Sequence, residues 1–164
     1  IIISATGLRI LMLGGMQLSI NGEPVELNKG MAYKGTMFEG VPNAAIVFGY
    51  TNSSWTLKAD ITSEYVCRLL NHMDKVGASK CVPVNKDASV EPENFLDMSS
   101  GYVQRAMQQL PKQGNKAPWR IYMIYALDLP VLRFSKIDDG VMEFSSPEVA
   151  AATRPAPRKK ASVA

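Results

Sequence analysis

Apolar side chains recur with a helical period between residues 54 and 76. Those that share one arc, at about 100° per residue, are Ile61, Tyr65, Val66, Leu69, Leu70, Met73 and Val76. Gly77 stands where a helix end is expected, and Lys75 places a positive charge in the last turn. The sequence therefore predicts one long amphipathic helix, with its N-cap among residues 51–54.

A continuous apolar run precedes this helix. It occupies residues 43–49, and such a run is typical of a strand that is covered on both faces of a parallel sheet. Ligand-binding crevices form beyond the carboxyl ends of such strands, so we expect residues 50–55 to line one. Residues 1–4 predict a second short strand, which ends in the small residues Ala5, Thr6 and Gly7. The expected fold class is α/β.

The rest of the chain shows shorter patterns. Asn21-Gly22 between two apolar segments predicts a small antiparallel hairpin, and Pro24 marks its second strand as an edge. The other elements that we expect are a loop with a short extended segment at 31–40, an exposed connector at 82–97, helices at 100–110 and 118–128, and a short strand at 141–144.

The 164 residues suffice for one domain with a core of its own. The net charge of +3 comes from the end of the chain, because the charges balance before Ser146. Residues 147–164 hold Lys and Arg in an Ala- and Pro-rich stretch, which predicts a disordered tail. We therefore expect no nucleic-acid binding by the folded part. No apolar run approaches the roughly 20 residues that cross a bilayer, so we expect no transmembrane segment.

The chain opens on Ile1 without an initiator Met or a basic leader. This argues against a secretory signal and favours a piece of a larger protein. Cys67 and Cys81 are too few and too far apart for a zinc knuckle or a redox pair, which fits a cytoplasmic protein with reduced thiols. His72 is the only histidine and cannot build a multi-histidine metal site. We expect no metal, an inert Cys67 and a structural His72.

The start of the long helix is the best candidate for a binding site. Its unpaired N–H groups and partial positive charge would stabilise an anion or an electron-rich ring edge, although an ordinary capped turn explains the same spacing. Trp55 is either a core residue or a surface for a planar ligand. The chain contains no G-x-G-x-x-G, phosphate loop, Ser elbow or cluster of metal ligands. By itself it carries no recognisable catalytic residues.

Several segments, in order, resemble one enzyme family. The first are Ile2-Ile3-Ser4-Ala5-Thr6-Gly7-Leu8 and Val47-Phe48-Gly49-Tyr50-Thr51-Asn52-Ser53-Ser54-Trp55-Thr56-Leu57-Lys58-Ala59-Asp60. Later ones are Tyr65-Val66-Cys67-Arg68-Leu69-Leu70-Asn71, Ser100-Gly101-Tyr102-Val103-Gln104-Arg105, and Leu110-Pro111-Lys112-Gln113-Gly114 with Pro118-Trp119-Arg120. Together they resemble the C-terminal third of flavin-dependent Baeyer-Villiger and flavin-containing monooxygenases, in particular the actinobacterial ethionamide-activating type.

The resemblance implies an incomplete Rossmann-like FAD/NAD(P)-binding domain over residues 1–78, a helical extension over 79–146 and the tail over 147–164. The FAD-binding residues that it implies are Thr6, Gly7, Gly49, Tyr50, Thr51, Asn52, Ser53, Trp55, Thr56 and Leu57. The whole enzyme would use NADPH to reduce FAD. It would insert one oxygen atom from O2 into a ketone, or oxidise the sulfur or nitrogen of a thioether or amine.

The glycine loops and catalytic residues of such enzymes would lie before Ile1, so no catalytic residue is assigned here. The expected partner is the upstream portion of the same enzyme, and the isolated piece is expected to be inactive. The alternative is a non-catalytic binding or scaffold module without cofactor. Nucleic-acid binding through the basic tail ranks last.

Overall fold

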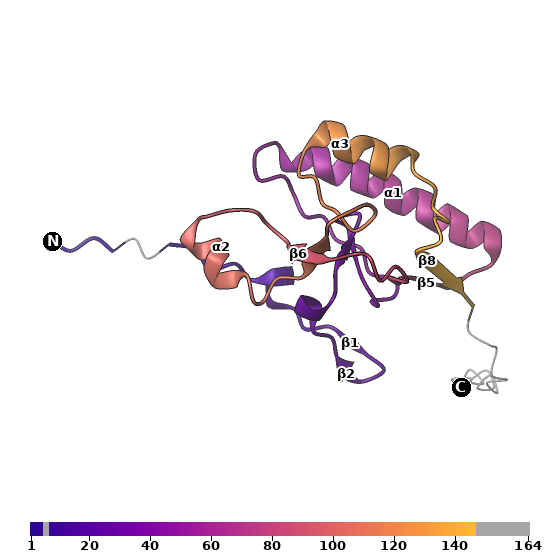
Figure 1. Ribbon diagram of the computed structural model, residues 1–164, viewed down its shortest axis with the longest axis horizontal. Helices are drawn as coiled ribbons and strands as arrows, with labels where there is room; N and C mark the ends of the chain where they lie inside the picture. Colours follow the sequence, from indigo (N-terminus) through magenta and orange to yellow (C-terminus); the bar gives the residue numbers. More distant parts are fainter. Residues whose placement is uncertain (5–6, 147–164) are drawn as a thin grey trace, which may run out of the picture.

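The computed structural model describes residues 1–4 and 7–146 (Figure 1). It is a mixed α/β structure in which one long helix lies beside small antiparallel sheets. The expected tail lies outside the described residues. Within them, no helix is long and apolar enough to cross a membrane.

Helix α1, Trp55–Val76, confirms the predicted amphipathic helix. Ser54 is its N-cap, and the Ser54 Oγ accepts a hydrogen bond from the Thr56 N–H at 3.3 Å. Gly77 ends the helix in the left-handed conformation, with φ at 66°, which glycine adopts at little cost.

The buried face of α1 is rotated relative to the predicted arc. Leu70 and Val76 remain 54% and 51% exposed, whereas Lys58 and Thr62 are buried instead. The observed stripe follows the helical period and consists of Lys58, Ile61, Thr62, Tyr65, Leu69 and Met73. Hydropathy finds Ile61, Tyr65, Leu69 and Met73 in this stripe. It misses Thr62 and Lys58, and the charge of Lys58 is neutralised by a residue far along the chain.

The described strands form antiparallel pairs. These pairs are β1 (Ser19–Ile20) with β2 (Glu23–Pro24), β3 (Ala32–Tyr33) with β4 (Met37–Phe38), β5 (Lys80–Pro83) with β8 (Met142–Ser145), and β6 (Pro92–Asn94) with β7 (Lys112–Gly114). The first pair confirms the predicted hairpin, since Asn21 and Gly22 take positive φ of 53° and 89° at its turn. Strand β8 confirms the predicted last strand within one residue.

The predicted parallel strands are wrong. Residues 1–4 are exposed and without strand pairing, and residues 43–49 form no strand. Ile46 instead joins the turn of the β3–β4 hairpin, because its N–H donates to the Thr36 carbonyl at 2.8 Å and its carbonyl accepts from the Thr36 hydroxyl at 2.9 Å. The run meets β4 at one isolated antiparallel bridge, between Ala45 and Met37. A single bridge is not a ladder, so the segment does not become a strand.

The predicted exposed connector is only partly exposed. It contains the second half of β5 and all of β6. Val90, Phe95 and Leu96 in it are buried in the core. Helix α2, Gly101–Ala106, confirms the position of the second helix but is shorter than expected. Two short 3-10 segments flank the first hairpin, Met12–Gly15 before β1 and Leu27–Lys29 after β2.

The predicted helix from Pro118 is wrong in its first half. Residues 117–119 form a turn, and residues 120–124 form neither helix nor strand. Strand β7 takes up backbone groups of this segment, since the Gly114 N–H donates to the Trp119 carbonyl at 2.9 Å and the Ile121 N–H donates to the Gln113 side-chain oxygen at 2.9 Å. Trp119 packs edge-on against Tyr33 at 5.7 Å between ring centroids. Only α3, Tyr125–Leu129, and the wider helical turn Pro130–Phe134 that follows it are helical.

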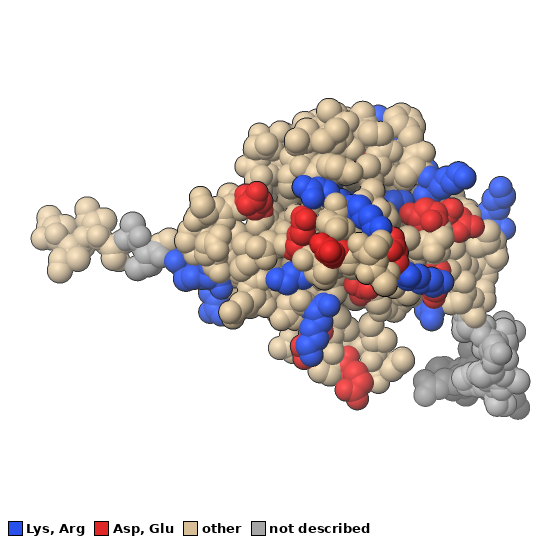
Figure 2. All heavy atoms as spheres, viewed as in Figure 1, with Lys and Arg blue, Asp and Glu red and all other residues tan. Residues whose placement is uncertain are grey.

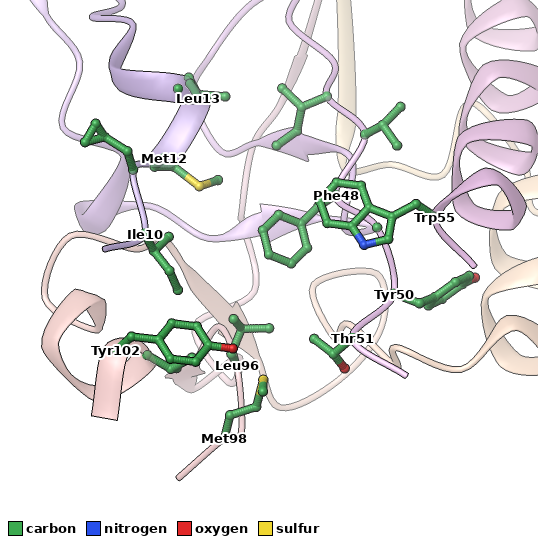
Figure 3. A pocket seen from close by; sticks show the side chains of 16 residues that line it. Ile10, Met12, Leu13, Phe48, Tyr50, Thr51, Trp55, Leu96, Met98 and Tyr102 are labelled. Carbon is green, nitrogen blue, oxygen red and sulfur yellow. The ribbon is translucent and has the colours of Figure 1, made fainter. Parts of the chain in front are cut away.

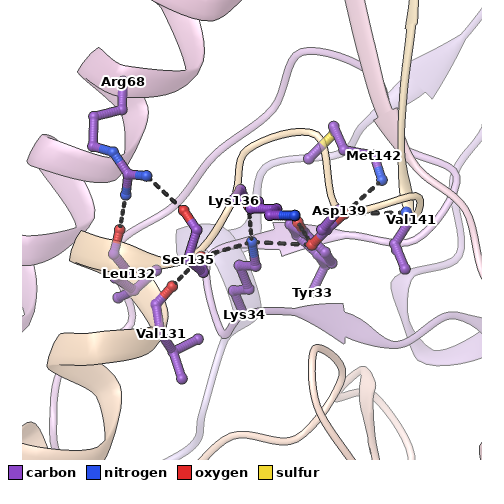
Figure 4. Close-up of polar contacts among 10 residues, drawn as sticks. All are labelled: Tyr33, Lys34, Arg68, Val131, Leu132, Ser135, Lys136, Asp139, Val141 and Met142. Atoms are coloured by element: carbon purple, nitrogen blue, oxygen red, sulfur yellow. Dashed lines mark hydrogen bonds and ion pairs between the residues drawn. The ribbon is translucent and has the colours of Figure 1, made fainter.

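A polar cluster ties the β3–β4 hairpin to the segment after α3 (Figure 4). The Tyr33 hydroxyl donates to Asp139 Oδ2 at 2.6 Å, and Lys34 Nζ lies 3.1 Å from the same oxygen. Lys34 also donates to the Ser135 hydroxyl at 3.0 Å. From α1, the Arg68 guanidinium donates to the carbonyls of Leu132 and Ser135 at 2.7 and 2.5 Å. Three segments far apart in the sequence are thereby held together.

The surroundings of Asp139 set its pKa. Burial raises the pKa of this carboxyl, but the hydrogen bond from Tyr33 and the charge of Lys34 outweigh burial, so the pKa lies below its ordinary value. Burial also raises the pKa of the Tyr33 hydroxyl, which therefore remains a donor. Lys34 and Asp139 form a largely buried ion pair, with side chains 2% and 19% exposed.

We expect Asp139→Asn to destabilise the protein by about 2–4 kcal/mol at pH 7, because Lys34 would remain buried without its counter-charge. Since the folded pKa of Asp139 is depressed, its contribution is present above the ordinary Asp pKa of about 3.9 and is lost as the pH falls through the folded pKa. Urea unfolding of both proteins across this range measures the difference. Asp138→Asn, at the exposed neighbour, is the control, and equal losses in both variants would contradict the role of Asp139.

Candidate functional site

A cavity of about 530 Å³ lies at the N-terminal end of α1 (Figure 3). One side of it is formed by the turn that leads into the helix. The opposite side comes from the segment before β1 and from the region around α2. Gly49, Thr51 and Trp55 lie on the first side, and Ile10, Met98 and Tyr102 lie on the second.

Gly49 and Trp55 shape the first side of the cavity. Trp55 is the first residue of α1, and its ring lies on the backbone of Gly49. A Cβ at residue 49 would stand 2.0 Å from Trp55 Cδ2, which no real contact permits. The Trp55 side chain is nevertheless 61% exposed. The glycine therefore lets a large flat ring lie at the cavity without being covered by the core.

Further aromatic rings support this side. Phe48 lies 6.3 Å from Trp55 between ring centroids, at an interplanar angle of 37°. Phe48 in turn meets the buried Phe95 edge-on at 4.9 Å. Edge-to-face contacts of this kind are favourable and fix ring orientation. The cavity thus has an aromatic surface backed by the core, which is suited to a planar, largely apolar ligand.

Tyr50 anchors the turn instead of facing the cavity with its polar end. Its side chain is 2% exposed, and its hydroxyl points away from the cavity in Figure 3. Burial raises the pKa of Tyr50, and the negative charge of Asp128 raises it further, so the hydroxyl remains neutral. The Lys58 ammonium lies 5.4 Å from the centroid of the Tyr50 ring, within the range of a cation–π contact.

Lys58 and Asp128 form a buried ion pair beneath this turn. Lys58 Nζ lies 2.8 Å from Asp128 Oδ2, and the two side chains are only 1% and 5% exposed. The pair joins the second turn of α1 to α3. Because a buried charge needs its partner, the pair fixes α1 relative to α3 and, through Tyr50, fixes the turn that borders the cavity.

The known proteins that this chain is similar to are named as FAD-containing or FAD-binding monooxygenases. The chain is 48% identical over 145 residues to the FAD-containing monooxygenase EthA of Mycolicibacterium smegmatis, with 88% of this chain and 30% of the relative covered. It is 46% identical over 157 residues to the EthA of Mycobacterium tuberculosis, covering 96% and 31%. It is 48% identical over 145 residues to the probable FAD-binding monooxygenase AlmA of an Acinetobacter species, covering 88% and 29%.

The chain belongs to the family of these FAD-containing monooxygenases. It spans about 30% of the length of these relatives. No family model matches the sequence. No solved structure matches it either.

The structure separates the predicted FAD-binding residues into groups. Gly49, Tyr50, Thr51 and Trp55 line the cavity. The others of the turn and first helical turn are exposed beside it without lining it, and these are Asn52, Ser53, Thr56 and Leu57. Gly7 lines a smaller neighbouring cavity. Thr6 lies outside the described residues. Contact of all these residues with FAD stays a prediction.

Sequence reasoning missed the second side of the cavity and the anchor below the first. Ile10 and Met98 come from segments without a clear period, and Tyr102 belongs to the predicted second helix. No pattern in the sequence placed any of them opposite residues 49–55. The anchor depends on Lys58 and Asp128, whose burial is invisible to hydropathy. A charged residue at a core position of the helical period was the available signal. The expected structural role of His72 agrees with its packing against Phe144, at 4.8 Å between rings.

We expect Gly49→Ala to displace the Trp55 ring and to destabilise the protein by about 1–3 kcal/mol, because the added methyl overlaps the ring. In a Trp55→Ala background the same change should cost much less, since the obstacle is gone. Urea unfolding of the parent protein, the two single variants and the double variant gives a double-mutant cycle for this contact. Equal costs of Gly49→Ala in both backgrounds would contradict the contact.

We expect Lys58→Met to destabilise the protein by about 3–5 kcal/mol, because Asp128 would stay buried without a counter-charge. The double variant with Asp128→Leu should recover most of this loss, since apolar residues of similar volume replace a buried pair well. Equilibrium unfolding of the single and double variants measures the coupling. A double variant that is no more stable than Lys58→Met would contradict it.

Proposed function

We propose that this chain forms one side of the flavin site of an FAD- and NADPH-dependent monooxygenase. The enzyme would insert one oxygen atom from O2 into a ketone, in a Baeyer-Villiger reaction, or would oxidise the sulfur or nitrogen of a thioether or amine. The proposal includes a cytoplasmic location. It also includes a Rossmann-like FAD/NAD(P)-binding domain to which residues 1–78 contribute, with residues 79–146 as its extension.

The observation that carries this proposal is the aromatic surface at the start of α1. An exposed, flat Trp55 ring held on Gly49 beside the end of a 22-residue helix suits a planar ring system with an electron-rich edge. The cavity volume of about 530 Å³ lies within the range of small-molecule and cofactor sites. The family of the relatives supports FAD as the ligand.

The residues suit distinct tasks toward such a ligand. Trp55 would cover a ring face, Thr51 offers a hydroxyl at the edge of the cavity, and Gly49 allows close approach of the backbone. When bound, FAD supplies electron transfer from NADPH and the activation of dioxygen. The chain's part is to orient the ring system and to exclude water on the side of Ile10 and Met98. No residue of this chain is proposed to be catalytic.

The isolated 164-residue chain should bind FAD weakly or not at all and should not oxidise NADPH, because its sequence lacks a G-x-G-x-x-G. Joined to the upstream sequence of its enzyme, it should purify with flavin and oxidise NADPH in the presence of a ketone or thioether. Absorbance spectra and NADPH consumption measure both. Stoichiometric flavin on the isolated chain, or a full-length protein without flavin, would contradict the proposal, and the latter would favour a binding or scaffold module.

In the full-length protein, Trp55→Ala should weaken FAD binding about tenfold, because the ring face loses its aromatic cover. Titration of the apoprotein with FAD measures the affinity. Leu70→Ala is the matched control, since Leu70 is an exposed apolar residue on α1 outside the cavity. Equal affinities of the Trp55→Ala and control variants would contradict a role of Trp55 in flavin binding.

A further inference from the structure

A second, smaller cavity of about 340 Å³ lies beside the first. It is bordered by the segment that follows Gly7 and by α2. Its polar side chains come from Arg9, Arg105 and Gln109, and no Asp or Glu lines it. Two guanidinium groups facing a cavity without a carboxylate make it electropositive.

These two arginines, here called the arginine pair, differ from the other described arginines. Arg120 pairs with Glu93 at 3.2 Å, and Arg133 pairs with Glu64 at 2.5 Å. Arg68 forms no salt bridge, but its guanidinium donates to two backbone carbonyls at 2.7 and 2.5 Å. Among the described residues, Arg9 and Arg105 form no salt bridge, and the hydrogen bond from Arg105 to the Leu8 carbonyl is long, at 3.4 Å. The arginine pair therefore retains free donors.

The distribution of charge on the surface agrees with the lack of acidic partners at the arginine pair. Over the middle of the face shown in Figure 2, basic and acidic side chains lie next to each other. The basic atoms nearest the N-terminal end have no acidic atoms beside them in this view. An anion that approaches this end of the molecule meets positive charge that is not already neutralised.

Small residues bring the backbone close to the Arg105 guanidinium. A Cβ on Gly7 would lie 3.6 Å from Nη2, and a Cβ on Gly101 would lie 3.4 Å from Nη1. Gly7 also takes a positive φ of 83°, which favours glycine. The exposed guanidinium thus lies beside two glycines, neither of which carries a side chain that would cover it.

The two cavities adjoin each other. Ile10 and Tyr102 line both, so that the electropositive cavity continues into the apolar region of Ile10, Met98 and Leu96 in the larger one. Figure 3 shows the Tyr102 ring between Ile10 and Met98, facing the larger cavity. A ligand that spans both cavities would place a charged end at the arginine pair and an apolar body along Tyr102.

We propose that the arginine pair binds the oxyanion head group, a carboxylate or a phosphate, of an amphiphilic small molecule whose apolar part lies along Ile10 and Tyr102. The planar fork of an arginine donates two parallel hydrogen bonds to such a group, and Gln109 offers a further donor at the rim. This assignment stands on the residues of the two cavities and does not require that flavin is bound in the larger one.

Isothermal titration of the 164-residue protein with decanoate and with decyl phosphate, both below their micelle concentrations, tests the proposal. We expect one site per chain, with an affinity that falls as salt is raised and rises two- to fourfold per methylene from hexanoate to decanoate. Arg9→Gln and Arg105→Gln should each weaken binding about tenfold. Arg120→Gln is the matched control and should bind like the parent protein.

Decanol and pyrophosphate separate the two halves of the ligand. Decanol has the apolar part without the charge, and pyrophosphate has the charge without the apolar part, so both should bind at least tenfold more weakly than decanoate. Decanoate and decyl phosphate together show which head group is preferred. Equal binding of decanol or pyrophosphate, equal losses in the control variant, or no binding of either decyl anion would overturn the proposal. Unchanged thermal unfolding of the variants excludes a loss of fold.

Discussion

The burial of one ion pair governs the arrangement around the larger cavity. Lys58 projects from the second turn of α1 into the core, and it can stay there only because Asp128 of α3 meets it at 2.8 Å. Two charges removed from water tolerate little displacement, because each would be left without compensation. The helix start and α3 are therefore fixed to each other, and Tyr50, packed above the pair, carries this constraint to the turn that precedes α1.

The cavity depends on two different kinds of support. Its aromatic side is rigid, since Trp55 lies on Gly49 and Phe48 is backed by Phe95. Its apolar side rests on Ile10 and on residues around α2, which are joined to the rest by packing against buried apolar residues such as Leu96 and Val103. Flat rings on one side and aliphatic or thioether groups on the other would accept ligands with an apolar body, and the nearby arginines add charge at one end only.

The sequence predicted the elements whose determinants are local. Helix α1 follows from its period and from Ser54 and Gly77 at its ends, and the first hairpin follows from Asn21-Gly22. Prediction from the sequence failed where contacts with distant residues decide the local structure. Trp119 and Ile121, in the predicted third helix, bind β7 instead. The run at 43–49 meets β4 through the single bridge of Ala45 with Met37 and does not form a strand. The first side of the cavity was predictable because it is continuous in sequence, whereas the side of Ile10 and Tyr102 is brought in by tertiary packing.

The pairing of β5 with β8 has a practical consequence. Strand β8 ends at Ser145, and in Figure 1 it lies at the far end of the molecule from the N-terminus and α2. Both cavities lie toward the N-terminus and α2. An affinity tag or a surface-immobilisation anchor introduced just after β8 would therefore leave the mouths of both cavities open to solvent.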